Sequence, residues 1–501
     1  MESGHCTDPH VKRILFLLGQ KIKLRLCWGE KVLNKVVFGV VVTSRSCFPD
    51  HLAVEARKMI LKKLDSMGFS SVIVSERDTP LGVVQTYSDA VKCADLFQKN
   101  RNRIDGVIAV LPNFGEETGV SAAIDQAQLQ VPVLVQACED SLEKLQIENR
   151  RDAFCGKLSL CNNLYQRGIR FTNTTTHTCS IDSDVFTKDL EFFAAVCRVV
   201  KGLSHARIGA IGSRPDPFHT VRYSEKLLQA YGITVSAVDL AEIIFKSREM
   251  GMTPEVSQKT EAIKNYGKIA PQYGEEDIIR QAKLCMVIED WVRENQCDAT
   301  AIQCWNALEQ YYGCAPCLAM SLMGERGLPS ACELDVLGAL TMYAMNLASG
   351  EPSGYLDWNN NYEEDRDKCI CLHCSNFPKR FAKAEMEISD LDVLGTTLGA
   401  ENCFGACKTR VAAGPMTFAK ITTDDRNGKI KAYVGEGEFT DDPAETKGGV
   451  AVCHVRGLQN MMKYITKNGF EHHVAMNRSS TADVLEEAFG NYLGWEVYRH
   501  R

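Results

Sequence analysis

Four residues in the last third of the chain have side chains that bind divalent metal ions: Glu333, Asp357, His373 and His473. Two carboxylates and two imidazoles suit an ion such as Mn²⁺ in an octahedral, oxygen-rich site. One chemistry open to such an ion is to hold two neighbouring sugar oxygens while a carboxylate moves a proton between the carbons that carry them. We therefore ask whether the fold can bring these four side chains together.

Glu333 has a simpler interpretation. Ser330 precedes it by three positions, and an apolar segment that we expect to be helical, Leu334 to Leu347, follows it. Serine followed three residues later by Glu is a capping box, in which the Glu satisfies backbone N–H groups at a helix start. Helix capping is the commoner role for such a residue.

The other three residues are equally ambiguous when each is taken alone. Asp357 ends a predicted short strand, where functional sites collect but ordinary Asx turns also occur. His373 lies in the apolar run Cys369–Cys374, where a histidine is usually a satisfied core residue. His472 and His473 follow Asn468-Gly469, so they form either a solvated loop or a ligand position.

Composition limits the classes of protein to consider. With 501 residues the chain is too long for one core and implies about three domains. Its 45% apolar and 24% charged residues are ordinary for a globular protein. The net charge of -7 argues against a sequence-independent nucleic-acid binder, which needs a basic face. A local basic pocket for a phosphorylated or sulfonated sugar remains compatible with this charge.

The cysteines and the N-terminus indicate a reducing compartment. The apolar run Ile14–Leu18 is too short for a signal-peptide core or a membrane span, so we expect a cytoplasmic protein with free thiols. A zinc site made from Cys314, Cys317 and the cysteines of 369–374 is an alternative. The 52 residues between Cys317 and Cys369 exceed the usual spacing of about 20 residues, so we favour buried free thiols.

Apolar runs alternate with helical patterns over most of the chain. Residues 1–34 show no period, and we expect an extension there that is disordered or poorly packed. Predicted strands follow at 35–43, 71–75, 106–111 and 131–136, with helices at 52–67, 86–99 and 116–128. A second cycle has helices at 185–202 and 220–231 and strands at 207–212, 233–240 and 299–304. This alternation predicts parallel sheets covered by helices on both faces.

The pattern changes after about residue 380. Predicted strands at 411–422 and 429–434 flank Asn427-Gly428, a strong hairpin signal, and residues 481–493 read as a helix. Gly435–Glu438 reads as a Gly-rich turn. We predict an α/β fold with two tandem doubly wound domains, 35–180 and 181–380, followed by a smaller, mostly antiparallel β domain, 381–501. The second domain carries the two acids and the third supplies His473.

The order and contexts of the four residues resemble the L-fucose/L-arabinose isomerase family. Further segments share the resemblance, which covers roughly residues 35–501: Ile211–Glu225, Gln303–Asn306, Gly327–Glu333, Ala413–Thr417 and Val434–Glu438. In that family an acid at a helix start, an acid at a strand end and a C-terminal histidine bind Mn²⁺. The arabinose branch adds a histidine at the place of His373. The family ligand aligns best with His473, and His472 stays open as an alternative because Gly469–His473 contains one extra residue.

The resemblance implies a Mn²⁺-dependent aldose–ketose isomerase. An open-chain sugar would pass through an enediol, with Glu333 and Asp357 as the acid–base pair. Activity would fall as His373 and His473 protonate below about pH 6. Sugar contacts are expected from four residues: Trp305, Asn359, Asn360 and Arg214. Core packing is an equally good interpretation of Trp305. The resemblance also implies a homo-oligomer, commonly a hexamer, with sites between subunits and with no nucleic-acid or membrane partner.

Two other functions fit parts of the sequence. An aldolase or epimerase would keep the metal and change the reaction. A non-catalytic sugar-binding protein would use tandem doubly wound domains without a metal, but would have no use for a third domain that supplies His473. Among isomerase substrates, L-fucose, D-arabinose, L-arabinose and C6-modified hexoses all fit.

Overall fold

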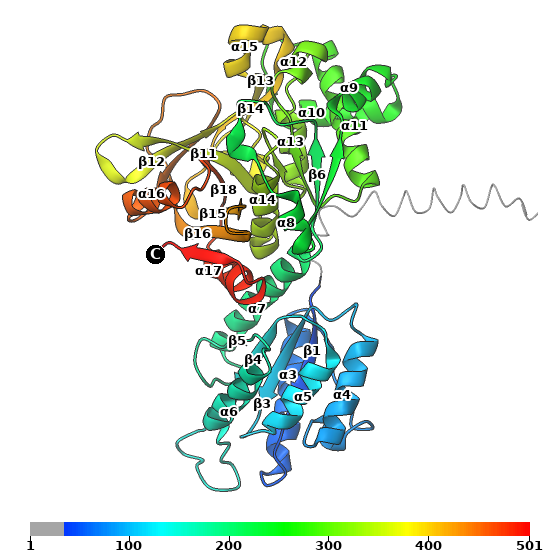
Figure 1. Cartoon of the computed structure of the whole chain (residues 1–501), viewed down its shortest axis with the longest axis vertical. Coiled ribbons are helices and arrows are strands. Elements are labelled where there is room, and N and C mark those ends of the chain that lie inside the picture. Colours follow the sequence, from blue (N-terminus) through cyan, green and yellow to red (C-terminus); the bar gives the residue numbers. More distant parts are fainter. Residues whose placement is uncertain (1–34) are drawn as a thin grey trace, which may run out of the picture.

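The chain forms two lobes joined by one long helix, α7 (Asp184–Leu203) (Figure 1). The structure is a computed structural model that describes residues 35–501. The predicted extension at 1–34 lies outside the described residues. One lobe holds the first parallel sheet, and the other holds the remaining two sheets (Figure 1).

The first sheet has five parallel strands in the order β2-β1-β3-β4-β5. Every residue of β3 and β4 is buried, which explains why their sequences are apolar throughout instead of alternating. The predicted strands and helices of this lobe are confirmed, with shifts of a few residues at their ends. The strands are β1 (Val37–Val42), β2 (Ser70–Val72), β3 (Gly106–Leu111), β4 (Val133–Ala137) and β5 (Thr172–Asn173). The helices are α3 (Asp50–Ser66), α4 (Tyr87–Lys99), α5 (Glu117–Ala127) and α6 (Ala153–Gln166).

Helix α7 belongs to both lobes. Ser183 caps its first turn by accepting a hydrogen bond from the backbone N–H of Phe186. Phe193 and Cys197 pack in the core of the first lobe, whereas Val199 and Leu203 pack in the core of the second. The helix therefore fixes the connection between the lobes through two apolar faces.

The second sheet has four parallel strands in the order β10-β9-β6-β7. Strands β7 and β9 lie on opposite sides of β6, so the loops that follow β6 and β9 run to opposite faces of the sheet. A binding crevice usually lies between two such loops, at the carboxyl ends of the strands. The strands are β6 (Arg207–Ile211), β7 (Thr234–Val238), β9 (Ala299–Ile302) and β10 (Ser330–Ala331). The helices are α8 (Glu225–Ala230), α9 (Leu240–Glu249), α10 (Pro254–Lys264), α11 (Glu275–Glu294), α12 (Ala307–Tyr311), α13 (Cys317–Glu325) and α14 (Val336–Ser349).

The third sheet has ten strands, in the order β19-β16-β15-β18-β11-β12-β17-β14-β13-β8. Most neighbours are antiparallel, while β8–β13, β14–β17 and β16–β19 are parallel. Its strands are β8 (Lys268–Ile269), β11 (Ser353–Tyr362), β12 (Asp365–His373), β13 (Glu387–Asp390), β14 (Phe404–Arg410), β15 (Gly414–Asp424), β16 (Lys429–Thr440), β17 (Gly449–His454), β18 (His473–Asn477) and β19 (Glu496–Arg499). The helical segments of this region are α15 (Asp392–Leu398), α16 (Leu458–Lys467), α17 (Ala482–Glu486) and a π-helical turn, Glu487–Tyr492. The predicted fold class is confirmed.

The hairpin predicted at Asn427-Gly428 joins β15 to β16, with Asp424 opposite Lys429 and Gly428 at a φ of 63°. The Gly-rich turn predicted at Gly435–Glu438 is wrong, because these residues pair with β15 inside β16. Strands β11 and β12 also join this sheet, although they precede residue 381. The division into domains stays a prediction.

Helix α14 fills the space between the second and third sheets. Twelve of its 14 residues are buried, and it contacts β9, β11, β15 and β18. A side chain at Gly338 would collide with the hydroxyl of Tyr355, so the helix approaches β11 as closely as its backbone allows. The position of α14 therefore fixes the preceding loop, which carries Glu333, against the third sheet.

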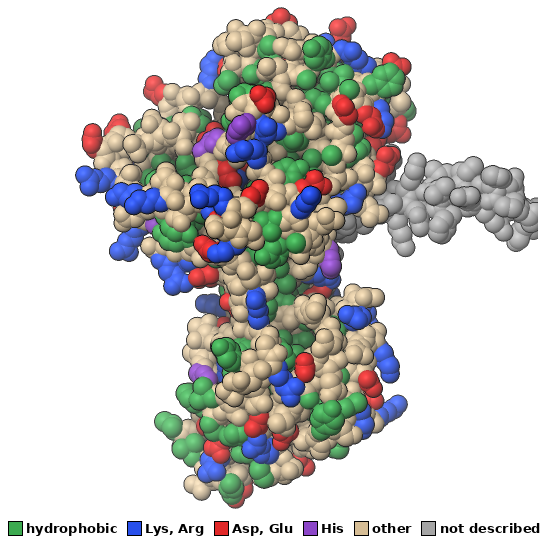
Figure 2. Space-filling view, viewed as in Figure 1, with side chains coloured by type: hydrophobic (Ala, Val, Ile, Leu, Met, Phe, Trp, Pro, Cys, Tyr) green, Lys and Arg blue, Asp and Glu red, His purple; other side chains and the backbone are tan. Residues whose placement is uncertain are grey.

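The surface shows acidic, basic and apolar side chains interspersed over both lobes, with a narrow waist between them (Figure 2). Within residues 35–501, none of the helices combines the length and apolar character that crossing a membrane requires. All described cysteines are free thiols, and most are buried, as predicted.

Candidate metal centre

Glu333 lies in a strained loop between β10 and α14. Glu333 and Leu334 both adopt left-handed backbone conformations, with φ of 60° and 59°. Non-glycine residues rarely do so, and such strain tends to occur at functional sites. The capping-box interpretation is wrong: Asp335 is the cap of α14, and its Oδ1 accepts the Gly338 N–H at 2.6 Å. Glu333 is thus free to point at the third sheet.

Three neighbouring strands of the third sheet supply the other predicted ligands. His473 opens β18, Asp357 lies directly opposite it on β11, and His373 ends β12. The Asx-turn interpretation of Asp357 is wrong, because this residue lies inside a strand. The structure therefore brings all four predicted ligands together where the second and third sheets meet.

The distances suit a common cation. Glu333 Oε2 and Asp357 Oδ1 lie 2.9 Å and 3.4 Å from His473 Nε2. Ligand atoms of Glu333, His373 and His473 all lie within 4.8 Å of one another, and those of Asp357, His472 and His473 form a second such group that shares His473. Adjacent ligands of an octahedral ion with bonds of about 2.1 Å are about 3 Å apart. The group is thus close to the spacing that an ion such as Mn²⁺ requires.

Each of the four residues has a buried polar atom that makes no regular hydrogen bond, although Glu333 and His473 approach each other closely. These atoms are Glu333 Oε2, Asp357 Oδ1, His373 Nδ1 and His473 Nε2. More than nine in ten buried polar groups in proteins are hydrogen-bonded, so four convergent exceptions need a physical reason. Two carboxylate oxygens and two imidazole nitrogens form a donor set that a divalent cation would satisfy, and the residues present therefore fit such an ion.

Behind His473 lies a hydrogen-bonded network that sequence reasoning missed. Asp335 Oδ2 lies 3.1 Å from His473 Nδ1 and accepts hydrogen bonds from Lys420 Nζ, at 2.6 Å, and from the Tyr355 hydroxyl. Asp335, Lys420 and Tyr355 are almost wholly buried. A carboxylate on the second nitrogen of a ligating histidine fixes its tautomer and orientation. The available sequence signal was a lysine within the strand 417–422, which is otherwise apolar or Thr.

The electrostatics keep Glu333 ionised. Burial acts to raise the pKa of Glu333, but close contact with His473 and the charges of His373 and His473 outweigh it and lower that pKa. Burial acts to lower the pKa of His473, but its contacts with Asp335 and Glu333 raise it. Burial also opposes ionisation of Asp335, yet Lys420 and His473 hold its pKa well below the usual range. The centre is therefore built to hold positive charge.

Comparison with known proteins places the chain in a family. The family model described as "Fucose/sulfoquinovose isomerase, N-terminal domain" matches residues 39–204. The model described as "L-fucose isomerase, C-terminal domain" matches residues 371–501. The chain belongs to the fucose-isomerase-like family.

Relatives named sulfoquinovose isomerase align with long parts of this family member. The protein from Priestia aryabhattai is 26% identical over 303 residues, which cover 60% of this chain and 66% of that protein, just under two thirds of its length. The protein from Alkalicoccus urumqiensis is 22% identical over 394 residues, or 76% of this chain and 83% of that protein. A solved sugar ABC transporter from Yersinia enterocolitica subsp. enterocolitica 8081 covers 64% of this chain and 78% of its own, with 12% identity and a TM-score of 0.14, too low to indicate a shared fold.

His472 lies at the more exposed edge of the centre, and its ligand atom lies within 4.8 Å of those of Asp357 and His473. Its side chain is 43% exposed, whereas that of His473 is fully buried. His472 Nε2 lies 3.6 Å from Asp357 Oδ1 and its Nδ1 lies 3.5 Å from Thr220 Oγ1. Of the two histidines, His473 is the one that the fold holds among the acids.

Trp305 lies one aromatic ring away from the centre. Its ring contacts Phe218 at 5.2 Å between centroids, and Phe218 in turn contacts the rings of His472 and His473 at 5.8 Å. Trp305 and Phe218 follow β9 and β6, respectively, so they occupy the crevice that the sheet topology predicts. Phe218 was not predicted from the sequence.

The other predicted sugar contacts lie away from this group. Asn359 and Asn360 are exposed toward the outer end of β11. Arg214 donates to the carbonyl groups of Pro215 and Asp216 in its own loop. Among the described residues, no interaction joins these three side chains to the four ligands. A single chain therefore does not support Asn359, Asn360 and Arg214 as sugar contacts.

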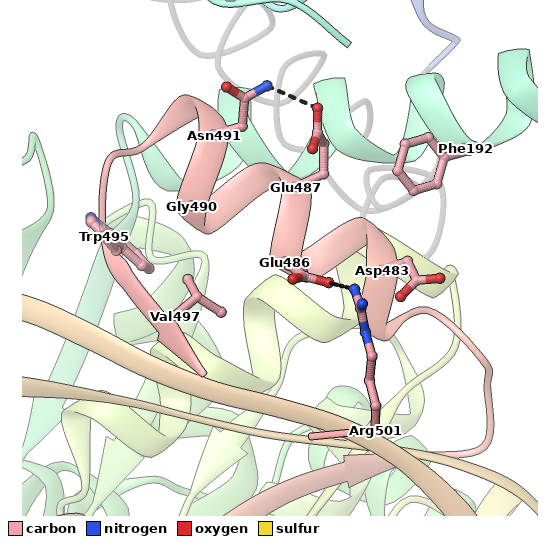
Figure 3. A pocket seen from close by; sticks show the side chains of 9 residues that line it. All are labelled: Phe192, Asp483, Glu486, Glu487, Gly490, Asn491, Trp495, Val497 and Arg501. Atoms are coloured by element: carbon pink, nitrogen blue, oxygen red, sulfur yellow. Dashed lines mark hydrogen bonds and ion pairs between the residues drawn. The ribbon is translucent and has the colours of Figure 1, made fainter. Parts of the chain in front are cut away.

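A cavity of about 660 Å³ lies elsewhere, between α7 and the C-terminal helical turns (Figure 3). Its polar lining is engaged in local contacts: Asn491 donates to Glu487 at 2.9 Å and Arg501 to Glu486 at 3.1 Å. The convergent unpartnered ligands, not this cavity, mark the candidate site.

Proposed function

We propose that the protein is a metal-dependent aldose–ketose isomerase and that its metal is Mn²⁺. The observation that carries the proposal is the convergence of four buried ligand atoms without hydrogen-bond partners, in a member of the fucose-isomerase-like family. The names of the aligned relatives support the reaction class. Glu333, Asp357, His373 and His473 would hold the ion.

A divalent ion held there supplies a Lewis acid that polarises a sugar carbonyl. The protein's own acids then move the proton between C1 and C2 of an open-chain sugar, through an enediol. Glu333 can accept that proton because its lowered pKa keeps the carboxylate ionised, and its side chain is only 7% exposed. Asp357 is 26% exposed, so it is suited to deliver a proton to the other side of the enediol.

His472 links this acid pair to solvent. It lies 3.6 Å from Asp357 and is 43% exposed, and burial together with the nearby His473 lowers its pKa. Once Asp357 has given its proton to the sugar, a neutral imidazole at that place can take up a proton from water and pass it to Asp357. We propose this role for His472 in place of metal binding.

For the substrate we propose a hexose modified at C6, either sulfonated or deoxygenated. The family descriptions name fucose and sulfoquinovose isomerases, which supports this choice over an unmodified pentose. The aromatic pair Phe218 and Trp305 offers an apolar surface beside the centre for the less polar edge of a sugar.

The two alternative functions are less well supported. A bilobed sugar-binding protein needs no third sheet, whereas here that sheet supplies three of the four ligands. An aldolase or epimerase would share the centre and differ in its products. We further propose a cytoplasmic homo-oligomer, in which a neighbouring subunit completes the sugar pocket, and sedimentation of the full chain tests that state.

The decisive experiment is turnover on a panel of sugars by chelator-treated protein with Mn²⁺ added back. The panel contains sulfonated, 6-deoxy and unmodified aldoses with their ketoses. We expect Mn²⁺-dependent formation of a ketose with the same number of carbons. Two fragments would mean an aldolase, and a C2 epimer alone would mean an epimerase. Tight Mn²⁺ binding without turnover on any sugar would reject the proposal.

A further inference from the structure

A second group of metal-type ligands, rich in sulfur, lies directly beside the first centre. Ligand atoms of Cys332, His373 and Cys374 all lie within 4.8 Å of one another. Cys304 adjoins this group, because its Sγ lies 2.9 Å from Cys332 Sγ, and it would supply a fourth ligand after a shift toward His373 and Cys374. We call these four residues the thiol cluster.

The fold, not local sequence, assembles the thiol cluster. Cys304 follows β9, Cys332 follows β10, and Cys374 follows β12. The zinc site considered from the sequence used a different set, starting from Cys314 and Cys317, and its wide spacing argued against it. In the folded chain Cys374 instead meets Cys332, which that set did not include.

Two buried polar side chains beside the sulfur atoms lack the partners that burial normally requires. His373 is 7% exposed, and its Nδ1 has no hydrogen bond within the described chain. Glu309, on α12, is fully buried, and neither of its carboxylate oxygens is hydrogen-bonded to any described residue. A negative charge on Glu309 and one on Cys374 oppose each other. A cation held by the cluster would relieve both deficits.

We propose that Cys304, Cys332, Cys374 and His373 form a second metal site, which takes a thiophilic cation such as Zn²⁺. Three sulfurs and one imidazole make up a common tetrahedral zinc set. With Zn–S bonds of about 2.3 Å, the ligands lie about 3.8 Å apart. The group of Cys332, Cys374 and His373 is therefore near the required size, whereas Cys304 would have to separate from Cys332 by about 1 Å and approach the other two ligands.

The alternative is that these are ordinary packed thiols, since free cysteine usually behaves as a small apolar residue. A second pair of cysteines in the chain is an example of thiols packed in an apolar core. Cys369 and Cys371 lie 3.8 Å apart at their sulfur atoms, within the apolar core of the third sheet. None of the metal-type groups among the described residues includes them. They provide a matched control.

The two sites share His373, because this imidazole belongs to both groups of ligand atoms. A thiophilic ion in the thiol cluster would compete for His373 and so weaken the first centre. For catalysis this predicts inhibition by Zn²⁺ at saturating Mn²⁺, a consequence that rests on the proposed isomerase function. The proposal that the thiol cluster binds a metal ion does not depend on the isomerase function.

The test titrates Cd²⁺, a spectroscopic probe for Zn²⁺, into reduced, chelator-treated full-length protein and follows the ultraviolet thiolate-to-cadmium charge-transfer absorption. We expect a saturable band with one Cd²⁺ per chain. Cys374→Ser, at a half-buried position, and Cys332→Ser should each lower the band amplitude by at least half. Cys369→Ser should leave it unchanged. Glu333→Gln should also keep the band, because Glu333 is a ligand of the first centre and not of the thiol cluster.

The outcomes separate the proposals. Absence of a band in the reduced wild type, or an equal band in Cys374→Ser and Cys369→Ser, overturns the thiol site. A Cys304–Cys332 disulfide in protein purified without reductant, with no Cd²⁺ uptake after reduction, overturns it as well. If the band behaves as expected and no sugar is isomerised, the site stands and the isomerase proposal falls. If both stand, Zn²⁺ should lower wild-type turnover by a larger factor than that of Cys374→Ser.

Discussion

Asp335 and His473 face each other at 3.1 Å on the side of the imidazole opposite Glu333. The same carboxylate accepts from Lys420 and Tyr355 through Oδ2 and caps helix α14 through Oδ1. Asp335 thus connects the first turn of α14, which follows Glu333, to His473, which Glu333 contacts. Since it acts through His473, Asp335 is a positioning residue.

Replacing Asp335 with Asn should weaken Mn²⁺ binding by about 10- to 100-fold, the usual effect of losing a carboxylate behind a ligating histidine. It should also destabilise the fold by about 3–5 kcal/mol, because Lys420 loses its buried partner. Calorimetric Mn²⁺ titration and denaturant unfolding measure the two effects. Lys420→Met is the control: it removes the ion pair and keeps the Asp335–His473 contact. If Lys420→Met weakens Mn²⁺ binding as much as Asp335→Asn, Asp335 does not position His473.

Glu333→Gln should lower turnover by about 10²- to 10⁴-fold, the range expected for loss of a general base. The amide has nearly the same shape, so folding should be retained. Exchange of the C2 proton with deuterated water distinguishes the roles of the acids. We expect Glu333→Gln to abolish exchange and Asp357→Asn to reduce it less. Turnover like that of the wild type, with Mn²⁺ still bound, would exclude Glu333 as the base.

Removal of the metal should destabilise the protein measurably. Four unpartnered polar atoms share one buried site, and a ligand that binds only the folded state at 100 times its Kd adds about 2.7 kcal/mol to the free energy of unfolding. Thermal unfolding after chelation and after Mn²⁺ addition measures this difference. His473→Ala should lose most of the Mn²⁺-induced shift. An equal shift in that variant would place the bound ion elsewhere.

Mn²⁺ affinity should increase with pH through neutrality. His473 must be neutral to bind a metal, and its contacts with Asp335 and Glu333 raise its pKa above the usual value of about 6.5. As pH falls through that raised pKa, the proton displaces the ion, so binding weakens at a higher pH than the value of about 6 expected from the sequence. Apparent Kd measured from about pH 5.5 to 8.5 tests this. In Asp335→Asn the midpoint should move down, and an unmoved midpoint would contradict the assignment to His473.

The sequence alone predicted much of the fold because parallel strands buried on both faces are apolar throughout, as β3 and β4 are. It predicted the four ligands only through resemblance, since each had a common structural interpretation. It could not reveal the network of Asp335, Lys420 and Tyr355, which meet only where helix α14 packs against β11 and β15. The capping box at Ser330 misled because β10 continues to Ala331 and the cap falls on Asp335. Gly435–Glu438 misled because local glycine content does not report the eleven-residue pairing of β15 with β16.

Glu309 should make the metal-free protein less stable as pH rises. Burial raises its pKa to about 8 from an ordinary value near 4.5, so the unfolded chain releases this proton at lower pH than the folded chain. Stability from the neutral form is complete below about pH 4.5 and is lost progressively up to about pH 8, with each pKa unit worth about 1.4 kcal/mol. Glu309→Gln, which does not ionise, should remove this loss and be more stable than the wild type at high pH. Urea unfolding of reduced, chelated protein at about pH 5 and 9 measures this loss of stability.

Glu289→Gln is the opposite control. Glu289 is paired with Lys259 and Arg326, and despite burial its pKa is lowered. Loss of this carboxylate should therefore destabilise the fold at both pH values. A pH profile of Glu309→Gln identical to that of the wild type would show that Glu309 is solvated or paired in solution.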